Sequence, residues 1–217
     1  VLSLAGEPFM ILDLFATRIV EGYPVAGKWE RVTVGYDENG FAIASDTAVY
    51  IGPSIPPHTG NVGTTLNFGN VSLRATGQFA MGHYVNHHIK PYMAINRTGE
   101  AYWRVVAANG NDPDHIEVRK FIERHRIYGD FIEPADWFKV REVVAAYTLP
   151  SEWAARFGAS SARVVVSGQN LLTITRYSGS DPEVSSTFGN GNNLSIGADY
   201  FTVPPSRQVM FGLSLQF

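Results

Sequence analysis

Apolar and polar residues alternate along the end of the chain, from Arg207 to Phe217. Successive side chains of a β-strand point to opposite faces of a sheet, so this alternation predicts a strand with one apolar and one polar face. The apolar positions are Val209, Phe211, Leu213, Leu215 and Phe217. Chain ends usually fray in water. An apolar face that continues to the last residue is instead typical of a strand that closes a membrane barrel.

The same alternation predicts a hairpin and two more strands upstream. The hairpin covers residues 61–81 and turns at Gly69-Asn70. Its strands of roughly ten residues have the length that a tilted membrane strand needs. Two further strands are predicted over 137–149 and 162–172. The apolar positions change phase within the first of these, which predicts a β-bulge near Arg141-Glu142.

The connections between the predicted strands alternate between short and long. The tight turn at Gly69-Asn70 and the connector 150–160 are short, and a helical turn around Trp153 is expected in that connector. Residues 82–136 and 173–205 are long, with a helix predicted over 114–125. Outer-membrane barrels have short periplasmic turns and long outer loops. The alternation therefore places both long connections outside the cell, including the glycine- and asparagine-rich stretch 189–193, which is interpreted as a flexible outer loop.

The N-terminal third is less regular. A strand over residues 9–18 is expected, and residues 31–36 and 41–45 predict a hairpin across Asn39-Gly40. We therefore divide the chain into an irregular N-terminal segment, 1–59, with a strand and an outer-loop hairpin, and C-terminal barrel strands with two long outer loops, 60–217. About six barrel strands result, whereas the smallest bacterial barrels use eight. The chain, which begins with Val1, is thus expected to be a fragment of a larger barrel or a processed product.

Composition supports a β-rich membrane protein. Charged residues make up only 17% of the chain and aromatic residues 12%, and the net charge of −3 argues against a nucleic-acid partner. The absence of cysteine excludes disulfides and thiolate metal sites. No apolar run approaches the roughly 18 residues of a spanning helix. A membrane protein with this sequence must therefore cross as a barrel, since lipid tolerates no unpaired backbone. The predicted fold class is all-β: an antiparallel transmembrane β-barrel segment with long extracellular loops.

Three histidines, His83, His87 and His88, lie close together after a predicted strand. A zinc site would need a third or fourth ligand and an ordered surrounding shell. We interpret them instead as loop histidines at the outer rim of the barrel.

Several acidic residues raise the alternative of an enzyme or a metal site. Paired carboxylates could hydrolyse glycosides, and Asp37, Asn39 and Asp46 could form part of a calcium loop. The carboxylates belong to a helix start and to loops, and the segment around Asn39-Gly40 is favoured as a hairpin turn. We predict no enzyme, no metal and no cofactor. The carboxylates considered for hydrolysis are Asp112, Asp114 and Glu117, and Glu133 with Asp136.

Aromatic residues of the first long connection form two groups. Tyr84 and Trp137 flank predicted strands and are expected in the aromatic belt at the outer membrane interface. Others could stack on a substrate or contact a lid protein. These candidate contacts are Tyr92, Tyr102, Trp103 and Tyr128.

Three segments resemble the C-terminal part of SusC/RagA-type TonB-linked outer-membrane proteins. Residues 138–150 are similar to the family's "F-x-R-L-R-N-V-T-L-G-Y-T-L-P". Residues 162–183 are similar to "L-R-V-Y-V-S-G-Q-N-L-L-T-F-T-K-Y-x-G-x-D-P-E", and residues 205–217 to "P-x-x-R-x-x-x-F-G-L-x-x-x-F". The segments occur in the family's order. A weaker similarity covers residues 50–57.

The resemblance implies a large barrel with an N-terminal plug, of the kind built from about 22 strands. It also implies TonB-driven import of glycans or peptides at the bacterial outer membrane. The implied partners are outer-membrane lipid, the barrel-assembly machinery, a SusD-like surface lipoprotein, and TonB through a plug not found in this sequence. The chain is expected to supply wall strands and outer loops. The alternatives are a structural or adhesive barrel without transport, and a soluble ligand-binding β-sandwich.

The terminal strand also matches the signal by which outer-membrane proteins are recognised for assembly. Gly212, Leu215 and Phe217 fit its pattern, whereas Met210 occupies a position that is usually polar. Strand addition to an exposed edge gives such a signal its physical basis. A strand that only faces lipid would have the same features.

Overall fold

The computed structural model describes residues 8–11, 16–184 and 196–217. Contacts divide the chain into two compact units that interleave along the sequence. The sheet unit contains His58–Met81, Trp137–Thr175 and Pro205–Phe217. The loop unit contains Val1–Pro57, Gly82–Asp136 and Arg176–Pro204. The division at residue 59 made from the sequence stays a prediction.

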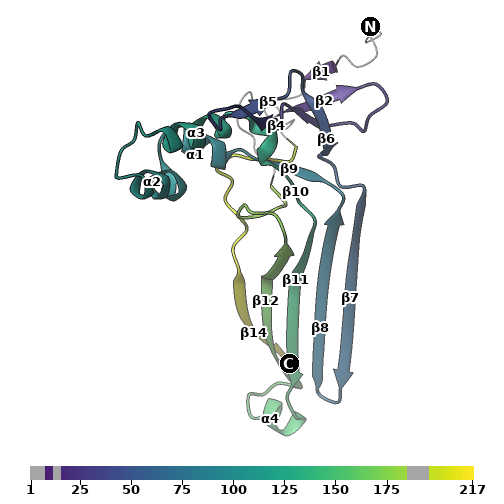
Figure 1. The fold of residues 1–217 in the computed structure, drawn as a ribbon. Coiled ribbons are helices and arrows are strands. Elements are labelled where there is room, and N and C mark those ends of the chain that lie inside the picture. The colour runs from purple at the N-terminus through teal and green to yellow at the C-terminus, as the bar shows by residue number, and fades with distance from the viewer. Residues whose placement is uncertain (1–7, 12–15, 185–195) are drawn as a thin grey trace. The chain divides into compact units, whose positions relative to one another are not determined.

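The sheet unit is one antiparallel sheet of five long strands (Figure 1). Its order is β14-β12-β11-β8-β7, so each strand pairs with the next strand of this unit along the chain, even where residues of the loop unit intervene in sequence. The hairpin turn at Gly69-Asn70 and the three later strands are thus confirmed. A short helix, α4 (Ser151–Ala155), lies in the predicted connector. The strands are β7 (His58–Phe68), β8 (Val71–Met81), β11 (Trp137–Thr148), β12 (Ser161–Thr175) and β14 (Gln208–Gln216).

The predicted bulge in β11 is confirmed. Val140 lies opposite Gly77 of β8, but Glu142 lies opposite Thr76, so β11 has one residue more than its neighbour at this point. On the other side β12 adds a further residue, and Asn170 there has a φ of 52°. Asparagine is among the few residues that adopt this left-handed conformation readily. The bulge lets apolar residues on either side of it share one face of the sheet.

The described residues of the loop unit form three small sheets. Its first has the order β1-β2-β3-β6, the second is the hairpin β4–β5, and the third has the order β10-β9-β13 with β13 parallel to β9. The predicted hairpin is confirmed, but the single strand over 9–18 is wrong. Pro8–Ile11 and Thr17–Val20 are two separate strands that pair antiparallel, and residues 12–15 between them lie outside the described part. The strands are β1 (Pro8–Ile11), β2 (Thr17–Val20), β3 (Gly27–Glu30), β4 (Thr33–Tyr36), β5 (Ala42–Ala44), β6 (Val49–Pro53), β9 (Tyr84–His87), β10 (Ile132–Pro134) and β13 (Ala198–Asp199).

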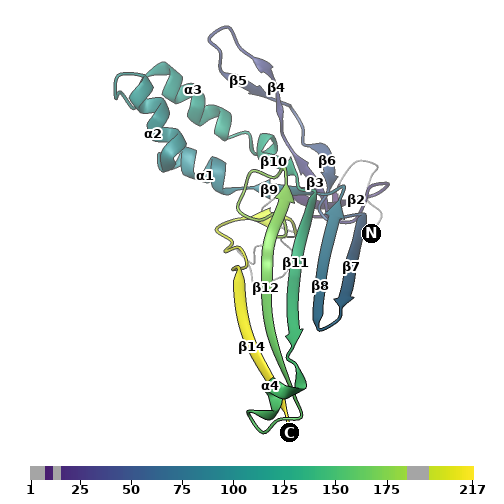
Figure 2. The ribbon, with the colours of Figure 1, turned by 90° about the horizontal axis from the view of Figure 1, so that it is seen from below.

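Helices fill the first long connection more densely than the sequence predicted. Besides the predicted α3 (Ile116–His125) there are α1 (Ile89–Ile95), α2 (Gly99–Ala108) and a 3₁₀ turn, η1 (Tyr128–Phe131). Figure 2 shows α1, α2 and α3 grouped together within the loop unit. Among the described residues, no helix has both the length and the apolar character needed to cross a membrane. The predicted loop at 189–193 lies outside the described residues.

The helices of the loop unit have their own small core. Tyr102 and Val106 of α2 pack with Val118 and Ile122 of α3, and all four are buried. Burying large apolar side chains in this way stabilises a helix pair that would be marginal alone. The core fixes how α2 and α3 present their remaining side chains.

Candidate functional site

One face of the five-stranded sheet is apolar across its whole width. Residues directly opposite one another in neighbouring strands share a face. One row consists of Leu66, Leu73, Ala145, Val166 and Phe211, one residue from each strand. The rows on either side of it are equally apolar, apart from Thr64. These rows are Phe68, Val71, Tyr147, Val164 and Leu213, and Thr64, Ala75, Val143, Gly168 and Val209.

The opposite face is mainly polar. One row there consists of Thr65, Arg74, Val144, Ser167 and Met210, and another of Gly63, Thr76, Glu142, Gln169 and Gln208. On β11, the Arg141 guanidinium donates to the Gln78 side chain at 2.9 Å. The sheet therefore gathers apolar side chains on one face, as the alternation in the sequence predicted, while the other face is mainly polar with Val144 and Met210 as exceptions.

The apolar face is exposed in the described structure. Phe211 is 80% exposed, Leu213 65% and Phe68 64%. A continuous apolar surface of this kind is rare on a monomer in water, where such patches usually indicate an interaction site. This face is therefore a candidate surface for contact with an apolar partner or medium.

The predicted interface aromatics occupy different surroundings. Trp137 is only 6% exposed, with the Lys139 ammonium and the Arg141 guanidinium each 5.2 Å from its ring centroid. Tyr84 is half-buried in β9, and its ring fills the space beside Gly52, where a Cβ would lie 2.2 Å from the ring. Their belt role stays a prediction.

The three residues of the assembly pattern lie on β14 or directly after it. Gly212 is opposite Val165 on the polar face, and Leu215 is opposite Ala162. Phe217 is 83% exposed. Recognition of these residues by the assembly machinery stays a prediction.

Four segments of the loop unit meet at one carboxylate, that of Glu133 on β10. Lys90 of α1 donates to Glu133 Oε1 at 2.9 Å. Ser178, in the long connection after β12, donates its hydroxyl to Oε1 at 2.7 Å and its backbone N–H to Oε2 at 3.0 Å. Nδ1 of His87, on β9, lies 3.6 Å from Oε1 and 3.1 Å from the Ser178 hydroxyl. We call these four residues the Glu133 cluster.

The electrostatics of the Glu133 cluster favour an ionised carboxylate. Burial alone would raise the pKa of Glu133, but hydrogen bonds from His87, Lys90 and Ser178 outweigh burial and hold the pKa well below its usual range. Next to the cluster, the Tyr177 hydroxyl donates to buried Asp199 at 2.8 Å. Burial, followed by the charge of Asp199, strongly raises the pKa of Tyr177, so its hydroxyl stays protonated. Both interactions tie the segment after β12 to the strands of the loop unit.

Of the three histidines interpreted as loop residues at the outer rim, His83 and His88 flank β9, whereas His87 is the last residue of that strand. Their position at the rim stays a prediction. His87 is 7% exposed in β9, the central strand of its small sheet, and His83, which precedes that strand, is 4% exposed. His88 stacks on Tyr128 with ring centroids 5.2 Å apart. Burial lowers the pKa of His83 and of His88, and this shift favours the neutral form of each ring.

Several of the other acidic residues considered for chemistry bind backbone groups or lysine. Asp112 accepts the Asp114 N–H at 2.9 Å, Glu117 binds Lys120, and Asp136 accepts the Gly82 N–H. Asp37 accepts the N–H groups of Asn39 and Phe41 at 2.9 and 2.8 Å, which confirms the predicted hairpin turn. Within the described residues, no group of three acidic or histidine side chains is arranged to hold a metal ion.

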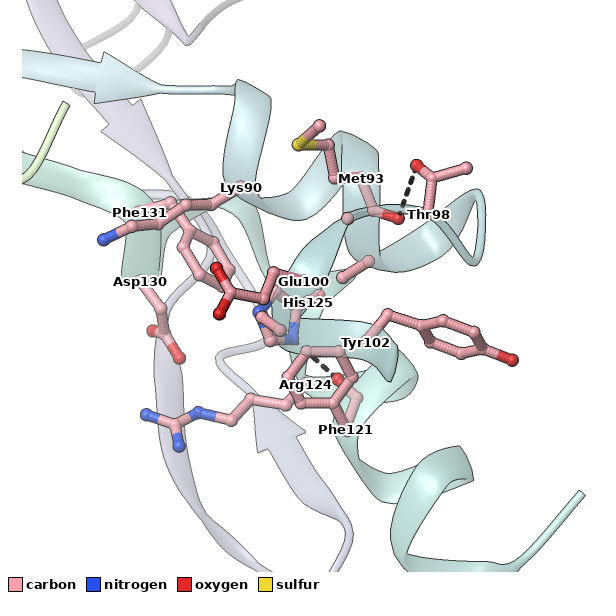
Figure 3. A pocket seen from close by; sticks show the side chains of 13 residues that line it. Lys90, Met93, Thr98, Glu100, Tyr102, Phe121, Arg124, His125, Asp130 and Phe131 are labelled. Carbon is pink, nitrogen blue, oxygen red and sulfur yellow. Dashed lines mark hydrogen bonds between the residues drawn. The ribbon is translucent and has the colours of Figure 1, made fainter. Parts of the chain in front are cut away.

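A cavity of about 400 Å³ lies among the helices of the loop unit. Figure 3 shows the rings of Phe121 and Phe131 in it, with the charged ends of Lys90, Arg124 and Asp130 toward one side. The Tyr102 side chain lines the cavity too, but it is only 2% exposed and belongs to the helix core. Of the other candidate contacts, Trp103 is 58% exposed, Tyr92 is 38% exposed and Tyr128 is half-buried. Their contact roles stay predictions.

The hairpin β4–β5 is anchored at its base to η1. The Gly129 N–H donates to the Arg31 carbonyl at 3.1 Å, and the Asp130 carboxylate accepts the Thr33 N–H at 2.9 Å. The Thr33 hydroxyl donates to the same carboxylate. A Cβ on Gly129 would lie 2.3 Å from the Arg31 carbonyl oxygen, so only glycine permits this approach.

Replacing Gly129 with alanine is therefore expected to release the hairpin from η1. Backbone atoms would have to move to relieve the contact with Arg31, at a cost of about 1–3 kcal/mol. Hydrogen–deuterium exchange of residues 31–45 should become faster. Gly35→Ala is the matched control in the same hairpin, because nothing lies within 4 Å of its Cβ position. Equal exchange in the two variants would contradict the proposed anchor.

Comparisons with known proteins agree with this architecture. No family model matches the chain. TonB-dependent receptor P3 from Formosa agariphila is 27% identical over 188 residues, which is 83% of this chain and 18% of the receptor. TonB-dependent receptor P26 from the same organism is 26% identical over 194 residues, 84% of this chain and 19% of that receptor. The chain thus spans about a fifth of the length of these curated relatives.

Solved structures with the same fold come from a peptide transporter. The structure of the RagAB peptide transporter matches with a TM-score of 0.69 at 20% identity, over 94% of this chain and 24% of that one. The RagAB peptide importer in its open-open state matches with a TM-score of 0.72 at 21% identity, over 98% of this chain and 24% of that one. Together with the curated relatives, these structures confirm the predicted resemblance to SusC/RagA-type TonB-dependent proteins.

Proposed function

We propose that the chain forms part of the wall and the outer loops of a TonB-dependent outer-membrane importer. The observation that carries this proposal is the five-stranded antiparallel sheet with one continuous apolar face and one polar face. Its strands have 9 to 15 residues, and a tilted strand needs about 9–11 to cross the hydrocarbon layer. In a barrel the apolar face would contact lipid and the polar face would line the interior.

The edges of the sheet favour a larger barrel. In the described structure, β7 and β14 each have a strand on one side only. A strand edge in lipid must be paired, because its N–H and C=O groups find no water there. In this proposal, further strands of the complete receptor pair with β7 and β14. A plug, contact with TonB and recognition by the assembly machinery belong to that complete receptor.

The loop unit would form the outer surface and carry the binding functions. The structural neighbours are described as a peptide transporter, so peptides are the first substrate class to test, and glycans are the second. A SusD-like lipoprotein would cover this surface. The residues described above bind one another and the backbone, so the proposed role involves binding and passage rather than bond chemistry.

Extraction and uptake experiments test this function. The protein should stay in the outer-membrane fraction after washing with carbonate or high salt and be released only by detergent. Deletion of its gene should abolish uptake of its substrate, as should loss of TonB. Release by carbonate would instead identify a soluble β-sandwich, and membrane insertion without any TonB-dependent uptake would identify a structural or adhesive barrel.

A further inference from the structure

A second cavity, of about 590 Å³, lies in the loop unit between the hairpin β4–β5 and the helices α2 and α3. Tyr36, Gly40 and Ala42 line it from the hairpin. Arg104 lines it from α2, and Lys120 and Arg124 line it from α3. We call it the cationic cavity. Figure 2 shows the hairpin and α3 side by side, as this lining requires.

The walls of the cationic cavity are held in place from both sides. The base of the hairpin is anchored to η1, which follows α3, by the hydrogen bonds of Gly129 with Arg31 and of Asp130 with Thr33. At the hairpin tip, a Cβ on Gly40 would lie 3.1 Å from the Lys120 ammonium, so that ammonium reaches directly to the turn. The cavity is therefore defined by packed and hydrogen-bonded elements rather than by one loose loop.

The charge of the cationic cavity is opposite to that of the chain. Arg104, Lys120 and Arg124 face it with a single carboxylate, Glu117, while the chain carries a net charge of −3. Glu117 binds Lys120 at 2.8 Å, and Arg104 forms an exposed ion pair with Glu100 of the same helix. Exposed pairs of this kind hold their partners weakly. Clefts lined mainly by one sign of charge concentrate ions of the other sign.

Arg124 is the residue best placed to bind an anion. Within the described residues its guanidinium has neither a hydrogen-bonded nor an ion-paired partner. It lines both cavities, and Figure 3 shows it extending past the Phe121 ring. Burial lowers the pKa of the neighbouring His125, and the charges of Arg124 and Lys90 lower it further. In the described part of the chain, a positive field is thus present where no carboxylate is bound to Arg124.

We infer that the cationic cavity binds an oxyanion, a carboxylate or phosphate group, carried by a soluble ligand. The guanidinium fork matches these groups with two parallel hydrogen bonds, and the Lys120 ammonium adds a point charge. The rings of Tyr36 and Phe121 in the same cavity can contact the apolar body of that ligand. The inference deepens the proposed function by giving the chemistry of a ligand for the loop unit.

Direct binding to the purified protein in detergent micelles tests this site without requiring transport. The probes are a tetra-aspartate peptide and a tetragalacturonate, each compared with a neutral counterpart, tetra-alanine and maltotetraose, by calorimetry at low and high salt. Inorganic phosphate, as a competitor, should displace the acidic probes. The acidic probes should bind more tightly than the neutral ones, and salt should weaken their binding. Preference between the two acidic probes would distinguish a peptide from a glycan framework.

Variants of α3 locate the site. Arg124→Gln should weaken binding of the acidic probes by about tenfold, as expected for loss of a charge-assisted hydrogen-bonded pair. Lys120→Gln should weaken it less, because Glu117 already binds this ammonium. Arg119→Gln is the matched control, because it removes the same charge from an exposed position of the same helix that lines neither cavity. Thermal unfolding of each variant verifies that it folds.

Several outcomes would overturn the site. Equal affinity of Arg124→Gln and Arg119→Gln, equal affinity for acidic and neutral probes, or no binding of any probe would each do so. Uptake that persists in cells lacking the gene, together with specific binding of the acidic probes by the purified protein, would count against the proposed function alone, which keeps the two proposals separate.

Discussion

Val166→Arg is expected to destabilise the membrane-inserted protein by about 2–4 kcal/mol, the usual penalty for a basic side chain at the lipid-facing midplane of a barrel. Val166 lies in the middle of the apolar face, between Ala145 and Phe211. In the proposed orientation, an arginine there would have lipid around it and no acidic partner opposite. The expected result is a lower urea midpoint in lipid vesicles and less protein in the outer membrane.

The neighbouring valine provides the control. Val165→Arg changes the same residue type in the same strand, but this side chain lies on the polar face, between Ala146 and Gly212. Its unfolding free energy should change by less than about 1 kcal/mol, as for a substitution exposed to water. The comparison tests which face meets lipid. Equal destabilisation by both substitutions, or a larger effect of Val165→Arg, would refute the proposed orientation of the sheet.

The sheet could be predicted closely because its determinants are local. Period-two alternation fixes which residues share a face, and a register shift of one residue would move every apolar side chain to the wrong side. Even the bulge was visible, because the apolar phase changes between Val140 and Val143. The predicted face of β14 is the one that the register with β12 produces.

The loop unit could be predicted only in part. Its hairpin and α3 have clear local signals, the Asn39-Gly40 turn and the start at Asp112-Pro113. The helix α1 contains Pro91 and α2 begins with Gly99, and both residues weaken a helical pattern. The predicted strand over 9–18 failed because tertiary pairing, not local propensity, decides between one strand and two.

The candidate sites of the loop unit depend on residues far apart in sequence. Lys90 and Ser178 lie 43 and 45 residues from Glu133, and no local pattern connects them. The same holds for the cationic cavity, whose walls come from Tyr36 and Arg124. A histidine near a predicted strand end could equally be exposed or buried, and for His87 the pairing of β9 on both sides explains its burial.

Replacing Glu133 with glutamine is expected to open the loop unit at the segment that follows β12. Glutamine keeps the shape of the side chain but loses the negative charge that Lys90 and the Ser178 N–H and hydroxyl bind. Hydrogen bonds to a charged group contribute about 1.5–3 kcal/mol each, so the local unfolding free energy should fall by at least that amount at neutral pH. Hydrogen–deuterium exchange of residues 84–87, 132–134 and 176–178 measures it.

A surface ion pair serves as the control for Glu133→Gln. Glu123→Gln removes a carboxylate that is bound to Arg126 with both side chains about half exposed. Such pairs contribute less than about 1 kcal/mol, so exchange in the same three segments should stay close to that of the unchanged protein. If Glu133→Gln behaved like Glu123→Gln, the cluster would not be what holds the segment after β12.

The pH dependence separates the charge of Glu133 from its shape. The folded protein lowers the pKa of Glu133 below the ordinary value of 4.5, so the unfolded state binds the proton more readily. The stability that the carboxylate contributes is therefore fully present above pH 4.5 and is lost as the pH falls from there toward the lower pKa of the folded state. The difference in exchange between the unchanged protein and Glu133→Gln should thus be large at neutral pH and shrink as the pH falls below 4.5. A difference that stayed constant over this range would mean that the carboxylate is not the group that holds these segments together.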